Sequence, residues 1–382
     1  MPPDYAPRHP YLKLALVSNT SLHGTEIPDG TERTFLLAKA TSIARGTDLR
    51  HTSFPVHQPR SFRRHELERL NHKQYLVSLK TDGVRYLLLL TRYNHEPRAV
   101  LIDRGMRVRE IEVWATDEFF NDTLIDGEMV TERNPANEVS DAFLAFDLLA
   151  CRGRSMEDCV YSERLSGLYS VLLSGTDRTE DTYDLTNTVL DGRKICAAPH
   201  KFFRIAAKAV MSAAYTDHIW EARGSSLHMN DGLIFTPNED RKSNEPVLKW
   251  KPLNTIDVLL RTNPNRPPSV LIRHSNKTRV TSFVDMGNGM KLRLVLEANV
   301  LLASLVEQGL VKFVAECACF IKGRVAFITP IRARLDKDTP NHIHVVKETL
   351  HNVIESVGAR DIIEMLGKAE PFAPSSPAYN ET

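Results

Sequence analysis

Two apolar runs flank one short polar segment in the first quarter of the chain. Residues 75–79 and 86–90 are mostly apolar, and residues 80–85 between them read Lys-Thr-Asp-Gly-Val-Arg. Their length and boundaries predict two buried strands, although periodicity alone does not separate these from buried helix. Gly83 permits an unusual backbone angle or a close approach at the turn. The pattern therefore predicts a strand-to-strand connection that carries charged side chains.

Lys80 in this connection has two interpretations. A lysine beside a low-dielectric wall can lose its proton near neutral pH and become a nucleophile. A surface turn with a salt bridge explains the same residues equally well, because a short Lys-x-Asp-Gly motif is common. The choice between the two depends on the rest of the chain.

The segments before Pro252 alternate between strand and helix patterns. Strands are predicted at 99–104, 124–130, 142–149, 232–236 and 247–251, and helices at 61–73, 161–173 and 203–214, with a polar loop at 174–194. Beyond Pro252, short strand candidates at 256–261, 270–273, 279–284, 311–321 and 324–328 suit a small antiparallel barrel. Helices are predicted at 291–307 and 341–357, the second opening after Pro340 and stopping at Gly358.

This pattern predicts two domains and a tail. We place the first domain at residues 1–251, with residues 1–50 as an N-terminal extension that packs on it. The barrel domain follows at 252–340, then a C-terminal helix at 341–366 and a flexible tail at 367–382. A chain of 382 residues has room for two such domains.

Composition indicates an ordinary soluble globular protein, with 42% hydrophobic and 25% charged residues. The net charge of +1 carries no global signal for nucleic acid or membrane, but residues 257–348 hold 14 Lys/Arg against 8 Asp/Glu. This basic segment suits a polyanion or a solvated surface equally. The five cysteines fit neither a disulfide framework nor a zinc site, and the alternation of Cys317 and Cys319 predicts buried thiols on one strand face. Without a membrane span or signal pattern, a cytosolic or nuclear protein is expected.

Charged residues inside apolar strands are the most informative positions. Glu128 follows Asp-Gly within one strand, Asp231 opens another, and Arg104 ends a third. Lys249 and Lys251 are two residues apart, so both side chains leave the same face of their strand. Buried charges are costly unless they are paired or face a ligand, so ion pairs at the rim of a sheet remain the alternative for each. As a set they supply cations for phosphates and carboxylates for a metal and a ribose, as a nucleoside triphosphate requires.

Six ordered segments resemble the motifs of the covalent nucleotidyltransferase superfamily, which comprises mRNA capping guanylyltransferases and polynucleotide ligases. They are KTDGVR (80–85), LIDGEMV (124–130), FLAFDLL (143–149), DGLIF (231–235), VLKWKP (247–252) and IRARLDK (331–337). Each motif alone is weak, but six in order over about 260 residues form a strong signal.

Further segments are similar to the capping branch of this superfamily. Residues 54–61 resemble the capping lead-in, although Val56 and Arg60 depart from its pattern. Residues 101–104, 201–203 and 255–257 resemble other capping elements, and residues 334–341 resemble the capping form of the last motif.

The resemblance implies the role of each site residue. Lys80 would attack the α-phosphate of GTP and carry GMP, while Arg104 and Glu128 would hold the ribose and Phe146 would stack on guanine. Lys249 and Lys251 would contact the α-phosphate. The complete set expected to bind GTP is Asp82, Arg85, Arg104, Glu128, Phe146, Lys201, Asp231, Lys249, Lys251, Asp257, Arg334, Asp336 and Lys337.

The remaining expectations also follow from the resemblance. The fold class is α+β: an ATP-grasp-like nucleotidyltransferase domain with antiparallel sheets, followed by a C-terminal OB-fold barrel that closes for the attack and brings Arg334 and Lys337 to the β- and γ-phosphates. Mg²⁺ or Mn²⁺ would lie near Glu128 and Asp231. The activity is mRNA guanylyltransferase, with GTP and a 5′-diphosphate RNA end as substrates; an ATP-dependent polynucleotide ligase and an inactive RNA-binding homologue are the alternatives.

The partners expected for this activity are an RNA 5′-triphosphatase, a cap methyltransferase and the RNA polymerase II tail, and no membrane. The expected location is the nucleus, or the cytoplasm for a viral protein.

Overall fold

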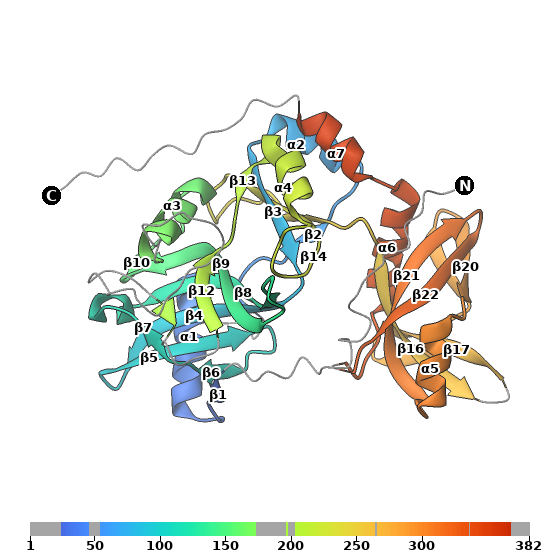
Figure 1. Ribbon diagram of the computed structural model, residues 1–382, viewed down its shortest axis with the longest axis horizontal. Helices are drawn as coiled ribbons and strands as arrows, with labels where there is room; N and C mark the ends of the chain where they lie inside the picture. Colours follow the sequence, from blue (N-terminus) through green and yellow to red (C-terminus); the bar gives the residue numbers. More distant parts are fainter. Residues whose placement is uncertain are drawn as a thin grey trace. The chain divides into compact units, whose positions relative to one another are not determined.

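The computed structural model describes residues 24–45, 54–172, 196–197, 203–263, 266–335 and 337–367 (Figure 1). They form two compact units, which we call the large unit (24–251 and 358–367) and the small unit (252–357). The large unit is therefore built from two separate stretches of chain. Within the described residues, no helix has the length and apolar character that crossing a membrane requires.

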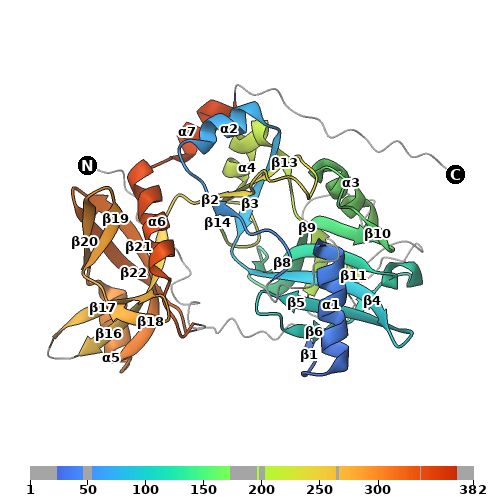
Figure 2. The same cartoon turned by 180° about the vertical axis from the view of Figure 1, so that it is seen from behind.

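Two sheets form the frame of the large unit (Figures 1 and 2). The eight-stranded sheet runs, in spatial order, β1 (Thr25–Glu26), β6 (Val108–Glu110), β5 (Glu96–Asp103), β4 (Val84–Tyr93), β8 (Thr123–Arg133), β9 (Val139–Cys151) and β10 (Arg154–Ser155), with β12 (Phe203–Ala207) parallel to β9. The five-stranded sheet runs β13 (Met211–Ser212), β3 (Tyr75–Thr81), β14 (Asn230–Pro237), β15 (Leu248–Trp250) and β2 (Arg60–Ser61). A two-stranded ribbon pairs β7 (Val113–Trp114) with β11 (Cys196–Ala197).

The eight-stranded sheet is covered on both faces. Leu87 and Leu89 of β4 lie in one core cluster with Leu36 of α1 (Thr31–Arg45), whereas Leu88 and Leu90 lie in another with Leu168 of α3 (Tyr161–Val171). Because successive strand residues point to opposite faces, burial on both sides requires an unbroken apolar run. The run at 86–90 is therefore the mark of a central strand.

The remaining helices of the large unit lie around the five-stranded sheet. They are α2 (Glu66–His72), α4 (Thr216–Ala222) and α7 (Ala359–Leu366), with the short 3₁₀ turns η2 (Asp117–Phe120) and η4 (Ala213–Tyr215) elsewhere in the unit. Ile362 and Leu366 of α7 are buried, and α7 packs on α2 and α4. The last helix thus belongs to the core of the large unit.

The small unit is one curled sheet of seven strands. Its spatial order is β18 (Lys277–Val280), β17 (Arg266–His274), β16 (Thr255–Asn263), β21 (Lys312–Lys322), β22 (Val325–Ala333), β20 (Met290–Leu296) and β19 (Phe283–Gly287). All pairs are antiparallel except β20 with β22, and α5 (Val300–Glu307) precedes β21. Helix α6 (Ile343–Glu355) contributes Val346 and Leu350 to the same core. This is the topology of a C-terminal OB fold, as expected.

The buried thiols of the small unit confirm one prediction. Cys317 and Cys319 are 0% and 7% exposed on the inner face of β21. No disulfide is formed by the four cysteines whose side chains the structure describes.

Three predicted helices, at 61–73, 203–214 and 291–307, differ from the structure. The first begins only at Glu66, because Ser61 belongs to β2 and pairs with Lys249 of β15. Residues 203–214 form β12, β13 and the start of η4, because 203–207 pair with β9, a partner far away in sequence. Residues 291–307 are strand β20 followed by α5, since Leu292 and Leu294 alternate with polar residues at the strand period. The helix predicted at 341–357 is confirmed as α6. The single C-terminal helix expected over 341–366 is instead two helices, α6 and α7, because Ser356 has a left-handed backbone, φ 48°, and Gly358 follows it. The expected loop at 174–194 lies outside the described residues, and so does all but Gly367 of the expected tail.

Candidate active site

The turn at 80–85 joins the two sheets of the large unit. Lys80 and Thr81 end β3, and Arg85 lies at the start of β4, which belongs to the other sheet. A Cβ at Gly83 would lie 2.3 Å from the carbonyl oxygen of Met129, so only glycine fits without movement. The close approach considered for Gly83 from the sequence is confirmed.

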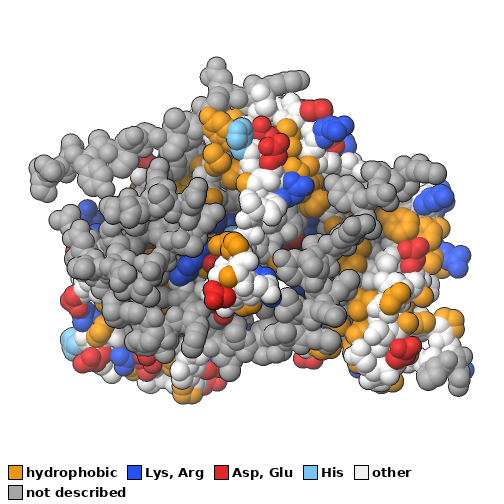
Figure 3. All heavy atoms as spheres, viewed as in Figure 1, with side chains coloured by type: hydrophobic (Ala, Val, Ile, Leu, Met, Phe, Trp, Pro, Cys, Tyr) orange, Lys and Arg blue, Asp and Glu red, His pale blue; other side chains and the backbone are white. Residues whose placement is uncertain are grey.

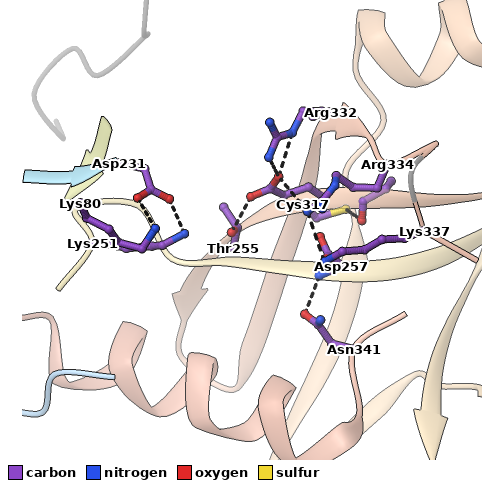
Figure 4. A network of polar contacts seen from close by, with 12 residues as sticks. Lys80, Asp231, Lys251, Thr255, Asp257, Cys317, Arg332, Arg334, Lys337 and Asn341 are labelled. Atoms are coloured by element: carbon purple, nitrogen blue, oxygen red, sulfur yellow. Dashed lines mark hydrogen bonds and ion pairs between the residues drawn. The ribbon is translucent and has the colours of Figure 1, made fainter. Parts of the chain in front are cut away.

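Asp231 bridges two lysines at the end of β3 (Figure 4). Lys80 Nζ donates to Asp231 Oδ1 at 2.6 Å, and Lys251 Nζ lies 2.5 Å from Oδ2. Asp231 sits at an irregularity between β14 and β3, where Gly232 has φ +153° and a Cβ would lie 2.0 Å from the Trp250 carbonyl oxygen. The bulge therefore fixes the carboxylate between the two ammonium groups.

The electrostatics of this bridge favour ionised Asp231. Burial acts to raise the pKa of its carboxyl, but Lys251 and Lys80 outweigh this effect and hold the pKa below its usual value. Lys249 precedes Trp250 on β15. Burial and the neighbouring charges of Lys251, Lys80 and Arg104 lower the pKa of Lys249. Several cations are thus concentrated around Lys80.

A second chain of contacts runs from Thr81 to the interior. Lys208 Nζ donates to Thr81 Oγ1 at 3.1 Å, Thr81 Oγ1 donates to Glu128 Oε2, and Lys208 Nζ lies 3.9 Å from the same carboxylate oxygen. The amine of Lys208 also lies 5.5 Å from the ring centroid of Phe146. Burial lowers the pKa of Lys208 to about 8.

Lys208 is a site residue that the sequence analysis does not predict. Residues 203–214 are predicted as a helix, and Lys201 is the lysine that the resemblance implies. Lys201 lies outside the described residues. The available signal is a single lysine directly after the apolar run Ile205-Ala206-Ala207. A charged residue beside buried apolar residues is costly unless it is paired or faces a ligand, which is also the reason for selecting Glu128.

Arg85 is held by a buried carboxylate. Its Nε and Nη2 donate to the two oxygens of Asp126 at 2.9 and 2.5 Å, and Nη1 donates to the His57 carbonyl oxygen at 3.0 Å. The guanidinium lies 5.5 Å from the Phe146 ring centroid. Partial burial and the Arg85 charge lower the pKa of Arg104, so these two arginines are electrostatic neighbours.

The small unit carries its own charged cluster (Figure 4). Lys337 Nζ donates to Asp257 Oδ2 at 2.5 Å, and Arg334 Nη1 lies 3.6 Å from the same oxygen. Asn341 Oδ1 accepts from the Asp257 backbone N–H at 2.8 Å, and Glu316 accepts from Arg332 at 2.7 Å. Asp257 is therefore held by two cations and an amide.

The structure brings most predicted site residues together within each unit. Contacts and electrostatic coupling connect eight of them in the large unit: Lys80, Arg85, Arg104, Glu128, Phe146, Asp231, Lys249 and Lys251. Asp257, Arg334 and Lys337 lie in the cluster of the small unit. Asp82 is exposed in the turn, with its N–H donating to the Met229 carbonyl oxygen at 2.9 Å. Asp336 lies outside the described residues.

The carboxylates of the site fit a divalent cation that shares its ligands with phosphate. No group of three or more His, Cys, Asp and Glu side chains gathers into a metal site among the described residues. Glu128 and Asp231 offer carboxylate oxygens, and Mg²⁺ is commonly held by one or two carboxylates plus substrate phosphates. The donor set therefore suits a metal that arrives with a nucleotide.

A lysine among cations and carboxylates at a strand end, on mainly antiparallel sheets followed by an OB fold, is the arrangement expected of a nucleotidyltransferase. A family model described as mRNA capping enzyme, catalytic domain, matches residues 17–253. The chain therefore belongs to the mRNA capping enzyme family and is a nucleotidyltransferase of the guanylyltransferase type.

Individual relatives agree with this assignment. The mRNA-capping enzyme subunit alpha of Schizosaccharomyces pombe is 29% identical over 345 residues, covering 85% of this chain and 82% of the relative. That of Eremothecium gossypii is 27% identical, covering 82% and 78%. Among solved structures, a mycobacterial DNA ligase D complexed with ATP and MES has a TM-score of 0.37 at 14% identity, covering 74% of this chain and 94% of the ligase chain. The sequence relatives favour the capping interpretation over the ligase alternative.

Proposed function

We propose that Lys80 is the nucleophile that carries GMP between GTP and RNA. The observation that carries this proposal is the position of its Nζ, 2.6 Å from Asp231 Oδ1, among the cations of the site. An amine that attacks phosphorus must be neutral, so it needs a proton acceptor and a fixed direction. Asp231 Oδ1 fixes the direction of the amine, and the proton passes to water, because the Lys80 side chain is 22% exposed.

In the first half-reaction, a bond forms between Lys80 Nζ and the α-phosphorus of GTP. The bond from that phosphorus to the bridging oxygen breaks, and pyrophosphate leaves with the electron pair. Lys249 and Lys251 stabilise the negative charge that develops on the α-phosphate. In the second half-reaction, a terminal oxygen of a 5′-diphosphate RNA attacks the same phosphorus. The N–P bond then breaks, its electron pair stays on the nitrogen of Lys80, and the nitrogen takes a proton from water.

We assign the base and ribose contacts from the surroundings of Phe146. Its ring would stack on guanine, and the cation of Lys208 at 5.5 Å would donate to a carbonyl oxygen on the base edge. A guanine carbonyl accepts such a bond whereas the amino group of adenine does not, so Lys208 would favour GTP over ATP. Arg104 and Glu128 would hold the ribose. Lys201 stays a weaker candidate for the base.

The phosphate tail and the metal complete the proposal. Arg334 and Lys337 would contact the β- and γ-phosphates, with Asp257 orienting Lys337 through its 2.5 Å contact. Mg²⁺ or Mn²⁺, held by Glu128 and Asp231, would neutralise phosphate charge. Three further expectations remain parts of this proposal. They are a domain boundary at 252, a nuclear location, or a cytoplasmic one for a viral protein, and cooperation with an RNA triphosphatase, a cap methyltransferase and the RNA polymerase II tail.

Covalent labelling tests the proposal directly. The chain is incubated with a divalent metal and α-labelled GTP or ATP, and label that survives denaturing electrophoresis is measured. We expect label from GTP, none from Lys80→Ala, and wild-type label from the matched exposed variant Lys242→Ala. Label from ATP alone would support a ligase, no label would support an inactive homologue, and persistent label on Lys80→Ala would exclude Lys80 as the nucleophile.

A further inference from the structure

One outer face of the small unit carries exposed aromatic rings. Phe320 of β21 is 45% exposed and lies opposite Phe327 of β22. The two rings are stacked, with centroids 4.8 Å apart and an interplanar angle of 10°. Phe283 of β19 is 61% exposed. It pairs with Arg293 of β20, and Arg293 pairs with Val325 of β22. Paired residues share a face, and so do residues two apart on one strand, so Phe283 points to the same side as Phe327. We call these three rings and the side chains between them the aromatic face.

Cations border the aromatic face. Exposed Lys291, Arg293, Lys322 and Arg324 lie on β20 or at the turn between β21 and β22, and none of them forms an ion pair with another described residue. Two carboxylates accompany them: Asp285, opposite Lys291, and Glu297, which accepts from Thr329 at 2.7 Å. Figure 3 shows hydrophobic side chains gathered on this part of the small unit, with Lys and Arg side chains at their border. The border thus carries an excess of positive charge.

The aromatic face continues into the charged cluster of the same unit. Phe320, Ala318 and Glu316 point to one side of β21, and Glu316 pairs across the sheet with Asp257. At about 3.4 Å per strand residue, Phe320 lies about 14 Å from Glu316 along the strand. A chain that leaves this cluster can therefore reach the rings within a few nucleotides.

We propose that the aromatic face binds the acceptor RNA as a single strand, by stacking bases on Phe320 and Phe283 while the bordering cations contact its phosphates. Every base has a π-face, so rings with cations beside them bind single strands without sequence preference. In OB folds the third strand and the turn between the last two strands, here β20 and residues 322–325, commonly contact oligonucleotides. This inference rests on the proposed function, since it supplies a path for the RNA that receives GMP.

The test separates the two half-reactions of the full chain. GMP is first loaded on wild type, Phe320→Ala and Phe283→Ala from labelled GTP, and the loaded proteins are then mixed with 5′-diphosphate RNA, either a dinucleotide or an oligonucleotide of about 16 nucleotides. We expect equal loading and equal transfer to the dinucleotide. Transfer to the long RNA at limiting concentration should fall about 5- to 150-fold for each variant, the effect of losing one base–aromatic stack.

Matched variants make the outcome specific to the rings. Phe320→Leu keeps an apolar side chain but removes the ring, and should behave like Phe320→Ala, whereas Phe320→Tyr should transfer as wild type does. Val300→Ala, at an 86% exposed apolar position on α5, should have no effect. The proposal is overturned if wild type does not prefer the long RNA, or if the alanine variants transfer to it as wild type does. Failure of wild type to load GMP would instead refute the proposed function.

Discussion

The replacement Lys208→Met tests the buried amine beside the nucleophile turn. Methionine has a similar length and no charge. In the wild type, the Lys208 side chain is 7% exposed, its Nζ donates to Thr81 Oγ1 at 3.1 Å, and burial lowers its pKa from 10.5 to about 8. The variant removes a titrating group from the interior without opening a large cavity.

The lowered pKa determines how stability should change with pH. Below about pH 8, Lys208 is protonated in both the folded and the unfolded chain, and the folded state bears the full cost of a buried charge. Between about pH 8 and 10.5 the unfolded chain binds more protons, so the free energy of unfolding contributed by this group rises with pH. The total rise is on the order of 3 kcal/mol, since one pKa unit corresponds to about 1.4 kcal/mol. Lys208→Met should lack this rise.

Urea denaturation of both proteins, at neutral pH and near pH ~10, measures the effect. Titrating groups that do not interact with Lys208 are shared, so they cancel in the difference between wild type and variant. The difference in free energy of unfolding between wild type and Lys208→Met should shift in favour of the wild type by most of the 3 kcal/mol as pH rises. Lys291→Met, at an exposed lysine, is the control and should show the pH dependence of the wild type. Parallel pH profiles for wild type and Lys208→Met would refute the reasoning.

Two further substitutions test the geometry of the site. Gly83→Ala should lower the free energy of unfolding by about 1–3 kcal/mol and slow GMP loading, because the new Cβ would lie 2.3 Å from the Met129 carbonyl oxygen. Gly30→Ala, where a new Cβ would meet no atom within 4 Å, is the control in both the calorimetric unfolding assay and the loading assay. Equal effects of the two substitutions would contradict the explanation. Lys337→Ala should slow GMP loading about 100-fold by removing one phosphate donor, whereas Lys312→Ala, at an exposed lysine of the same unit, should leave the initial rate unchanged. An unaltered rate for Lys337→Ala would remove this residue from the reaction.

Local patterns were sufficient for much of the fold. The apolar run at 86–90 identified a central strand, and the alternation of Cys317 and Cys319 identified an inner strand face, because each pattern reflects burial of residues adjacent in sequence. Residues 291–307 carry a local signal of the same kind: Leu292 and Leu294 follow the strand period of β20, and only the later residues form α5.

Long-range pairing limited the rest. The strand at 203–207 exists because it lies parallel to β9, about 60 residues earlier, and nothing within the segment reveals that partner. Its assignment as a helix concealed Lys208, whose importance comes from Thr81, Glu128 and Phe146 on other strands. The motifs of the chain located Lys80 and its neighbours, but only the tertiary structure showed that Asp231 is shared by two lysines.

The position of α7 has a consequence for how the protein is made. Ile362 and Leu366 complete a core whose other residues precede position 252, so the whole small unit is translated before the large unit acquires its last helix. During synthesis the surfaces of α2 and α4 that receive α7 stay uncovered on the ribosome for about 100 residues of elongation, several seconds at ordinary translation rates. The nascent chain can therefore form its nucleotide-binding sheets early, but it reaches its final stability only when the segment beyond the OB fold has emerged.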